Sequence, residues 1–321
     1  MRIARPSHNR TGSIRRLTIG PGLTWRAWYG AVKAVIMGLN DSNIALISAG
    51  IAFYGMLAIF PTLAAIIALW GFFADPDEVY AQLETARSLI PEDAYAILDQ
   101  QITSLITANS STLGWATIIS LSAALWSSRA GVAALIRGLN AIYREKNRVG
   151  IRQIAAAFGV TFLLIAVALV ALVSVVVLPI VLAILPLGPI TALLIASVRW
   201  VVALAVVIVG IGVLYRFGPN RRKARVPWLT PGALVAVVIW GSISYGFSLY
   251  LSNFGRYNEV YGALGAVIAL LMWLYLSAFS VLLGAALNAE LELRTRHDST
   301  VGKPRPMGER RATVADTYVA D

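Results

Sequence analysis

Few residues in this chain have the type and spacing that chemistry requires, and the first is an arginine beside a long apolar stretch. Residues 153–198 carry no charge, and Arg199 follows them directly. Counted from an outer boundary near Ile190, Arg199 lies about 14 Å along a helix, close to the middle of a hydrocarbon core about 30 Å thick. A charge at that depth costs at least about 2.5 to 3.5 kcal/mol unless it is paired or hydrated.

No carboxylate in the apolar stretches falls at the depth of Arg199. An arginine without an acidic partner indicates a hydrated cavity or an anionic ligand such as a phosphate, which a guanidinium can bind through two parallel hydrogen bonds. The alternative is a structural arginine that donates to backbone carbonyls and tyrosines. Residues at comparable depth complete the predicted substrate pathway, which comprises Arg199, Tyr54, Pro61, Ser122, Tyr245 and Tyr275.

Pro61 lies deep in the first apolar stretch, where its ring removes a backbone hydrogen bond. The position predicts a kink or the start of a new half-helix. Such breaks are tolerated where protein or water covers the freed carbonyl, so the break is consistent with a site, and a purely structural kink is the alternative.

Polar residues gather at the two ends of the last apolar stretch. At the inner end, Arg129 either extends to the cytoplasm or pairs with Glu290, while Asn288 either caps the last helix or lines an inner gate. Gly262 and Gly265, three residues apart, indicate a close helix contact rather than a phosphate loop. The predicted outer mouth comprises Tyr257, Asn258, Glu259, Tyr261, Gly262 and Gly265.

Other kinds of chemistry are poorly represented. The chain has no cysteine, and His8 and His297 lie alone in the terminal segments, so we expect no metal site and no cofactor. The acidic residues of segment 74–112 follow amphipathic helical spacing and suit a solvated surface better than paired carboxylate catalysis. The sequence therefore predicts that the protein is not an enzyme.

Composition indicates a membrane protein, because 58% of residues are hydrophobic, 13% are charged and the mean hydropathy is +0.72. The net charge of +11 resides in short segments between apolar stretches, and these basic segments alternate with segments poor in Lys and Arg. By the positive-inside rule, this alternation predicts six transmembrane helices with both termini in the cytoplasm. The expected fold class is an all-α polytopic helix bundle, with further amphipathic helices before the first span and in the first outer loop.

The chain divides into three predicted parts. Residues 1–40 form a basic cytoplasmic segment with an amphipathic helix, which lies either on the cytoplasmic leaflet or on the protein's own loops. Residues 41–292 form the membrane domain, with the outer amphipathic insertion at 74–112. Residues 293–321 form a mixed-charge, turn-rich cytoplasmic tail that we expect to be disordered. The apolar stripe of the first helix comprises Trp25, Trp28, Tyr29, Val32, Val35, Ile36 and Leu39.

Four motifs resemble the YihY/virulence factor BrkB family of bacterial inner-membrane proteins, in the family's order from about Asp41 to Glu292. One departure is the stretch Gly55, Met56 and Leu57, where the family carries more polar residues. The motifs are Ala49-Gly50-Ile51-Ala52-Phe53-Tyr54 with Phe60-Pro61, then Leu125-Trp126-Ser127-Ser128-Arg129 with Leu139-Asn140-Ala141-Ile142-Tyr143, then Tyr257-Asn258-Glu259-Val260-Tyr261-Gly262-Ala263-Leu264-Gly265-Ala266, and finally Leu283-Gly284-Ala285-Ala286-Leu287-Asn288-Ala289-Glu290.

The resemblance implies a fold and an inner-membrane location more than an activity. Members have been labelled ribonuclease BN, but metal-dependent RNA hydrolysis needs clustered ligands that this chain lacks. We expect a transporter or translocator of a lipid-like or anionic amphiphile, or alternatively an envelope scaffold that binds partners through its outer helices. The expected partners are membrane lipids with anionic headgroups at the basic loops, other copies of the chain or envelope proteins, and no nucleic acid.

Overall fold

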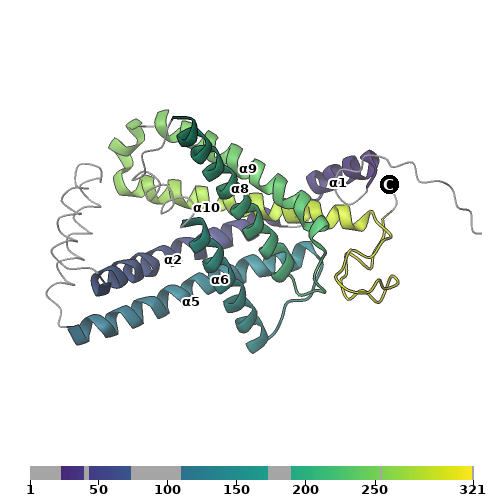
Figure 1. The fold of residues 1–321 in the computed structure, drawn as a ribbon, viewed down its shortest axis with the longest axis horizontal. Helices are drawn as coiled ribbons and strands as arrows, with labels where there is room; N and C mark the ends of the chain where they lie inside the picture. Colours follow the sequence, from purple (N-terminus) through teal and green to yellow (C-terminus); the bar gives the residue numbers. More distant parts are fainter. Residues whose placement is uncertain (1–22, 40–42, 74–109, 173–188, 254, 320–321) are drawn as a thin grey trace, which may run out of the picture.

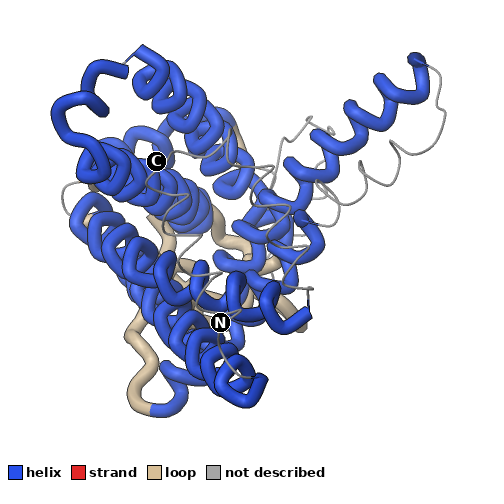
Figure 2. Tube along the Cα trace, turned by 90° about the vertical axis from the view of Figure 1, so that its left-hand side faces the viewer, coloured by secondary structure: helices blue, strands red, loops and turns tan. Residues whose placement is uncertain are grey.

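A computed structural model of the chain describes residues 23–39, 43–73, 110–172, 189–253 and 255–319 (Figure 1). Within these ranges the chain forms seven α-helices and no strand beyond an isolated bridge between Ala224 and Thr300 (Figure 2). The all-α prediction is confirmed for these residues. The helices are α1 (Trp25–Met37), α2 (Ile44–Phe73), α5 (Ser110–Ile142), α6 (Ile151–Leu172), α8 (Pro189–Phe217), α9 (Val226–Asn253) and α10 (Gly255–Leu293).

The long helices pack in a closed order. Helices α2 and α5 lie side by side, α5 contacts α6, α6 contacts α8, and α8 contacts α9 (Figure 1). Helix α10 packs on α9 and returns to both α2 and α5. Leu139 of α5 and Leu282 of α10 are fully buried in the core where these helices meet.

Helices α9 and α10 approach each other at backbone distance. A Cβ atom at Gly232 would overlap the carbonyl oxygen of Gly284, and a Cβ atom at Gly284 would overlap the carbonyl oxygen of Gly232. The hydroxyl of Tyr215 lies against the same crossing and donates to the carbonyl of Val281 at 2.6 Å. Small residues permit such close packing, which stabilises helix pairs in lipid where burial of apolar surface gives little driving force.

Three described helical segments are long and apolar enough to cross a membrane: Ile151–Ala171, Pro231–Tyr250 and Val267–Leu293. Two shorter apolar segments, Ile44–Ile59 and Val201–Phe217, belong to α2 and α8. Large apolar side chains project outward from these helices, including Phe162, Leu204 and Val238. Many exposed large apolar side chains of this kind suit lipid better than water.

Helix α1 forms where the sequence predicts it, but its predicted apolar residues do not all lie on one face of the helix in the same environment. Thr24 begins the helix by accepting from the backbone N–H of Ala27 at 3.4 Å, a typical N-cap contact. Ala27 and Ala31 are buried, and Trp28 and Val35 pack against the cluster that Ala31 forms with Leu287 and Leu291 of α10. The predicted apolar stripe is therefore divided between a face that packs on the protein and a face that is exposed.

Residues 294–319, which the sequence predicted to be a disordered tail, make long-range contacts in the structure. This C-terminal segment packs on the loop between α8 and α9, where Arg225 N–H donates to the Ser299 carbonyl at 2.8 Å and Val301 N–H donates to the Lys223 carbonyl at 2.9 Å. Val314 is completely buried in the main core.

The buried guanidinium of Arg310 organises the interior of this segment. It donates to the carbonyls of His297, Ala315, Arg296 and Arg305 at distances of 3.2, 2.7, 2.7 and 3.1 Å. Side-chain donors of this kind satisfy backbone groups that a chain without regular secondary structure would otherwise leave unpaired. The mixed charges that suggested disorder thus serve as internal hydrogen-bonding groups.

Candidate functional site

The predicted pathway residues are distributed over five helices, α2, α5, α8, α9 and α10. Arg199 lies in the continuous helix α8, ten residues after its first residue Pro189, and Pro61 lies within α2, which continues as a helix on both sides of it. The continuous α2 is inconsistent with two separate half-helices. The side chains of Arg199 and Pro61 lie outside the described set.

The structure brings Tyr54 close to α5 and α10. Gly131 of α5 lies beside Tyr54, since a Cβ atom built on this glycine would be 3.9 Å from the Tyr54 Cβ. The next residue, Gly55, would place a Cβ atom 3.7 Å from the side chain of Leu274 in α10. Tyr275 follows Leu274 and stacks on Phe279 with a ring-centroid distance of 6.2 Å. Helices α2, α5 and α10 therefore meet near Tyr54.

The other two pathway residues are more exposed. Ser122 lies on α5, nine residues before Gly131, which is about 14 Å along the helix. Its side chain is exposed, and Tyr245 on α9 is 69% exposed. The described side chains do not bring Tyr245 to the meeting point near Tyr54.

The predicted outer mouth lies on the first turns of α10. This helix begins at Gly255, so the residues from Tyr257 to Gly262 are helical rather than part of a loop before the helix. Gly265 is half-buried, and the other predicted mouth side chains (Tyr257, Asn258, Glu259, Tyr261 and Gly262) lie outside the described set.

Arg129 and Glu290 do not pair with each other. The Arg129 guanidinium lies over the ring of Trp126, 4.3 Å from its centroid, and near the ring of Phe158 at 5.7 Å. Such contacts stabilise a cation in partly desolvated surroundings. Glu290 instead accepts from Arg294, one turn later in the chain, at 2.6 Å.

Asn288 neither caps the last helix nor stands at an open gate. Helix α10 continues for five residues beyond it, to Leu293. Its buried side chain accepts from the backbone N–H of Gly232 at 2.8 Å and donates to the carbonyl of Leu229 at 3.1 Å. Gly232 follows Pro231 in α9, so the amide of Asn288 satisfies one backbone donor and one backbone acceptor near the start of α9 and joins this helix to α10.

Sequence reasoning missed a buried ion pair between Arg221 and Glu292. The two Nη atoms of Arg221 bind the two carboxylate oxygens at 2.7 and 2.5 Å, and both side chains are 2% exposed. Ser299 also donates to the Glu292 carboxylate, and the Arg221 guanidinium lies 4.9 Å from the centroid of the Tyr143 ring. No local spacing could have indicated this pair, because its members are 71 residues apart.

The surroundings fix the protonation of this cluster. Burial acts to lower the pKa of Arg221, but the charge and hydrogen bonds of Glu292 outweigh it and raise the pKa above its ordinary value. Burial raises the pKa of Tyr143 well above its ordinary value. The arginine therefore stays charged and the tyrosine neutral at physiological pH, so the cluster suits a structural role better than proton transfer.

A profile described as "Virulence factor BrkB" matches residues 35–308. The chain is similar to "Putative ribonuclease-like protein YfkH" of Bacillus subtilis (strain 168), with 30% identity over 271 residues that cover 78% of this chain and 90% of that protein. It is also similar to a "UPF0761 membrane protein" of Xanthomonas campestris pv. campestris (strain B100), with 43% identity over 97 residues, 30% of this chain and 23% of the relative. No solved structure gives a significant match. Since the profile covers most of the sequence, the chain belongs to the virulence factor BrkB family of membrane proteins.

Proposed function

We propose that this protein is a bacterial inner-membrane translocator of a lipid-like or anionic amphiphile, with six spans and both termini in the cytoplasm. The observation that carries the proposal is Arg199, a cation in the apolar helix α8. An ionisable residue inside a membrane helix is costly and typically marks a pathway for an ion or a substrate. The proposed pathway comprises Arg199, Tyr54, Pro61, Ser122, Tyr245 and Tyr275, of which Tyr54 and Tyr275 lie near the meeting point of α2, α5 and α10.

The chemistry of the spans favours an anionic substrate group. Arg199 lies near the middle of its predicted span, whereas the glutamates of the apolar segment Val267–Leu293, Glu290 and Glu292, lie at its end. A phosphate or carboxylate on the substrate would supply a negative charge for the Arg199 guanidinium and would bind it through charge-assisted hydrogen bonds. The same distribution disfavours a proton relay built on intramembrane carboxylates.

The positions of the basic loops support the proposed orientation, in which both termini lie in the cytoplasm. Thr313 N–H donates to Glu145 at 2.7 Å, and Arg148 donates to the carbonyl of Gly218 at 2.8 Å. The loop after α5, the loop after α8 and the C-terminal segment thus lie at one end of the bundle. Basic segments of this kind favour the cytoplasmic side.

A ribonuclease activity is not part of the proposal. The name of the Bacillus relative is ribonuclease-like, but metal-dependent hydrolysis of RNA requires clustered ligands for the ion. The sequence has no cysteine and only His8 and His297 as histidines. Among the described residues, no three His, Cys, Asp or Glu side chains are grouped in a way that could hold a metal ion.

The test is reconstitution of the full chain in liposomes that contain a fluorescent anionic phospholipid. Transfer between leaflets is followed by the fraction of label that an impermeant reductant can reach. We expect the wild-type protein to accelerate transfer and Arg199→Ala to slow it by about tenfold to a hundredfold, the value of a lost charge-assisted hydrogen bond. Arg137→Gln is the matched control, because it removes one exposed cation near the end of α5 and should transport normally.

The scaffold alternative makes the opposite prediction. If the wild-type protein moves no labelled phospholipid or other anionic amphiphile, and Arg199→Ala leaves a cellular phenotype intact while deletion of residues 77–108 abolishes it, translocation is excluded. The inserted segment would then carry the function by binding partner proteins.

A further inference from the structure

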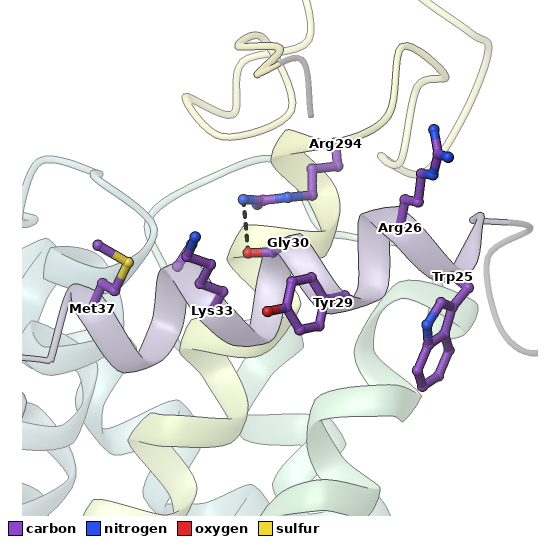
Figure 3. Close-up of a pocket in the computed structure, with 8 residues that line it drawn as sticks. Trp25, Arg26, Tyr29, Gly30, Lys33, Met37 and Arg294 are labelled. Atoms are coloured by element: carbon purple, nitrogen blue, oxygen red, sulfur yellow. Dashed lines mark hydrogen bonds between the residues drawn. The ribbon is translucent and has the colours of Figure 1, made fainter.

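An open groove of about 550 Å³ lies between α1 and the end of α10 (Figure 3). Its charged lining residues are Arg26, Lys33 and Arg294, and the lining contains no carboxylate. Arg294 is held in place by Glu290 at 2.6 Å and by the carbonyl of Gly30 at 3.1 Å, so α1 is tied to the end of α10. The remaining lining residues are Trp25, Tyr29, Gly30, Ala34 and Met37.

The exposed side of α1 has two adjoining surfaces. Trp25, Tyr29, Val32 and Ile36 follow a spacing of four, three and four residues, so they share one helical face, and all four are exposed. Arg26 and Lys33 are seven residues apart and lie beside that face, also exposed. Among the described residues neither cation is paired with a carboxylate.

The level of α1 relative to the apolar segment of α10 explains this arrangement. That apolar segment ends at Leu293, and Arg294 is the next residue. Since Arg294 binds Gly30, the helix α1 lies at the boundary between the apolar core and the aqueous side. Tryptophan and tyrosine favour this boundary, and cations there attract anionic lipid.

We propose that the groove is a binding site for an anionic phospholipid of the adjacent leaflet. The phosphate would lie between Arg26, Lys33 and the edge of Arg294, while the acyl chains would cover the apolar face formed by Trp25, Tyr29, Val32 and Ile36. The basic lining and the adjoining exposed apolar face together match a ligand that is anionic at one end and apolar at the other. The site does not depend on translocation and would bind lipid equally in a protein that transports nothing.

The experiment is a titration of the purified full chain in detergent with dansyl-labelled phosphatidylglycerol, followed by energy transfer from tryptophan. We expect saturable binding that unlabelled phosphatidylglycerol displaces and phosphatidylcholine does not. In the double variant Arg26→Gln with Lys33→Gln, affinity should fall about 30-fold, because each cation near an anionic headgroup contributes about 1 kcal/mol. Both side chains are exposed, so the variant keeps the fold, which circular dichroism checks.

A matched control removes two exposed cations at the same end of the molecule. Lys303→Gln with Arg311→Gln lies in the C-terminal segment and should bind phosphatidylglycerol like the wild type. Equal binding by the groove variant and the wild type would overturn the proposal. Displacement of the label by glycerol phosphate as efficient as by phosphatidylglycerol would also overturn it, since the ligand would then be a soluble phosphate.

Discussion

Arg221 and Glu292 form an ion pair that is almost entirely removed from solvent, where each charge depends on the other. Taking two charges out of water is costly, and their attraction compensates only when geometry and additional hydrogen bonds are good. Here the arginine binds both carboxylate oxygens, and Ser299 adds a donor. The pair also ties the loop after α8 to the end of α10.

Replacing one partner should destabilise the protein more than replacing both. Glu292→Ala leaves a buried, unpaired arginine, so we expect a loss of about 3 to 5 kcal/mol. The double change Arg221→Met with Glu292→Leu removes both charges and should recover much of that loss. Thermal unfolding in detergent measures both.

Glu290→Ala provides the control for this comparison. Glu290 and Arg294 are one helical turn apart, and the Glu290 side chain is 22% exposed. Their ion pair should therefore contribute no more than about 1 kcal/mol to the free energy of unfolding. Equal effects of Glu290→Ala and Glu292→Ala would contradict the argument from burial.

Asp298 makes the docking of the C-terminal segment sensitive to acid. Slight burial acts to raise its pKa, but hydrogen bonds from Thr300 and from the N–H of Arg305 lower the pKa below the usual 3.8. Because the pKa of Asp298 is lowered in the folded protein, its ionised carboxylate contributes fully to the stability of the docked segment above pH 3.8. This stability is lost as the pH falls through the folded-state pKa.

A spin label on Lys303→Cys reports this effect, since the natural chain has no cysteine. We expect constant label mobility between pH 7 and pH 5 and a rise below about pH 4. With Asp298→Asn in addition, mobility should be higher at pH 7 and change less with acid. A rise of identical size and midpoint in both proteins would show that another group controls the segment.

Among the helix pairs, α9 and α10 show most directly how small residues determine packing. The backbone of Gly284 occupies the space that a side chain at position 232 would need, and the backbone of Gly232 occupies the space that a side chain at position 284 would need. At the same crossing, Asn288 binds backbone groups in the first two turns of α9. A larger residue at either glycine would therefore separate the helices and break these bonds together.

Gly284→Ala should destabilise the protein by at least about 1 to 3 kcal/mol, the usual cost of overpacking, because rigid backbone rather than a flexible side chain occupies the space. The melting temperature and the yield of monodisperse protein measure the effect. Gly241→Ala is a matched control in α9, since nothing lies within 4 Å of its added Cβ. This control should be neutral or stabilising by up to about 1 kcal/mol, because alanine favours helices. A similar loss in both variants would point to helix propensity instead of the crossing.

For the whole molecule, the charged loops and both described terminal regions gather at one end of the bundle (Figure 1). Helix α1 binds the end of α10, and the C-terminal segment covers the loops after α5 and α8. The opposite ends of the long helices lie away from this assembly. An orientation in the membrane therefore assigns all of these parts to one side.

Single cysteines test this topology. Val149→Cys and Lys303→Cys should resist an impermeant maleimide in intact spheroplasts and react after permeabilisation, because both are exposed on the end that we assign to the cytoplasm. Leu187→Cys lies in the stretch Leu185-Pro186-Leu187-Gly188-Pro189, which the six-span topology predicts to be an outer turn, and it should react without permeabilisation. Labelling of Val149→Cys and Lys303→Cys from opposite sides would contradict the structure, and labelling of Leu187→Cys only from inside would contradict six spans.

The sequence by itself determined the class of the protein. Apolar stretches of about 20 residues or more are set by bilayer thickness, and they indicated membrane helices without any tertiary information. The four family motifs were also sufficient, as the match over residues 35–308 confirms. The helix around Trp25–Met37 followed from local periodicity alone.

Tertiary structure alone decided which polar residues meet. A pair between Glu290 and Arg129 was only one of two alternatives in the sequence, and Glu290 instead pairs with Arg294, while Glu292 pairs with Arg221 across 71 residues. The C-terminal segment looked disordered because its order comes from long-range bonds rather than from helix or strand periodicity. Periodicity reports only the environment that a helix face or a strand face prefers, whereas partners for buried charges depend on how helices cross, which local sequence does not encode.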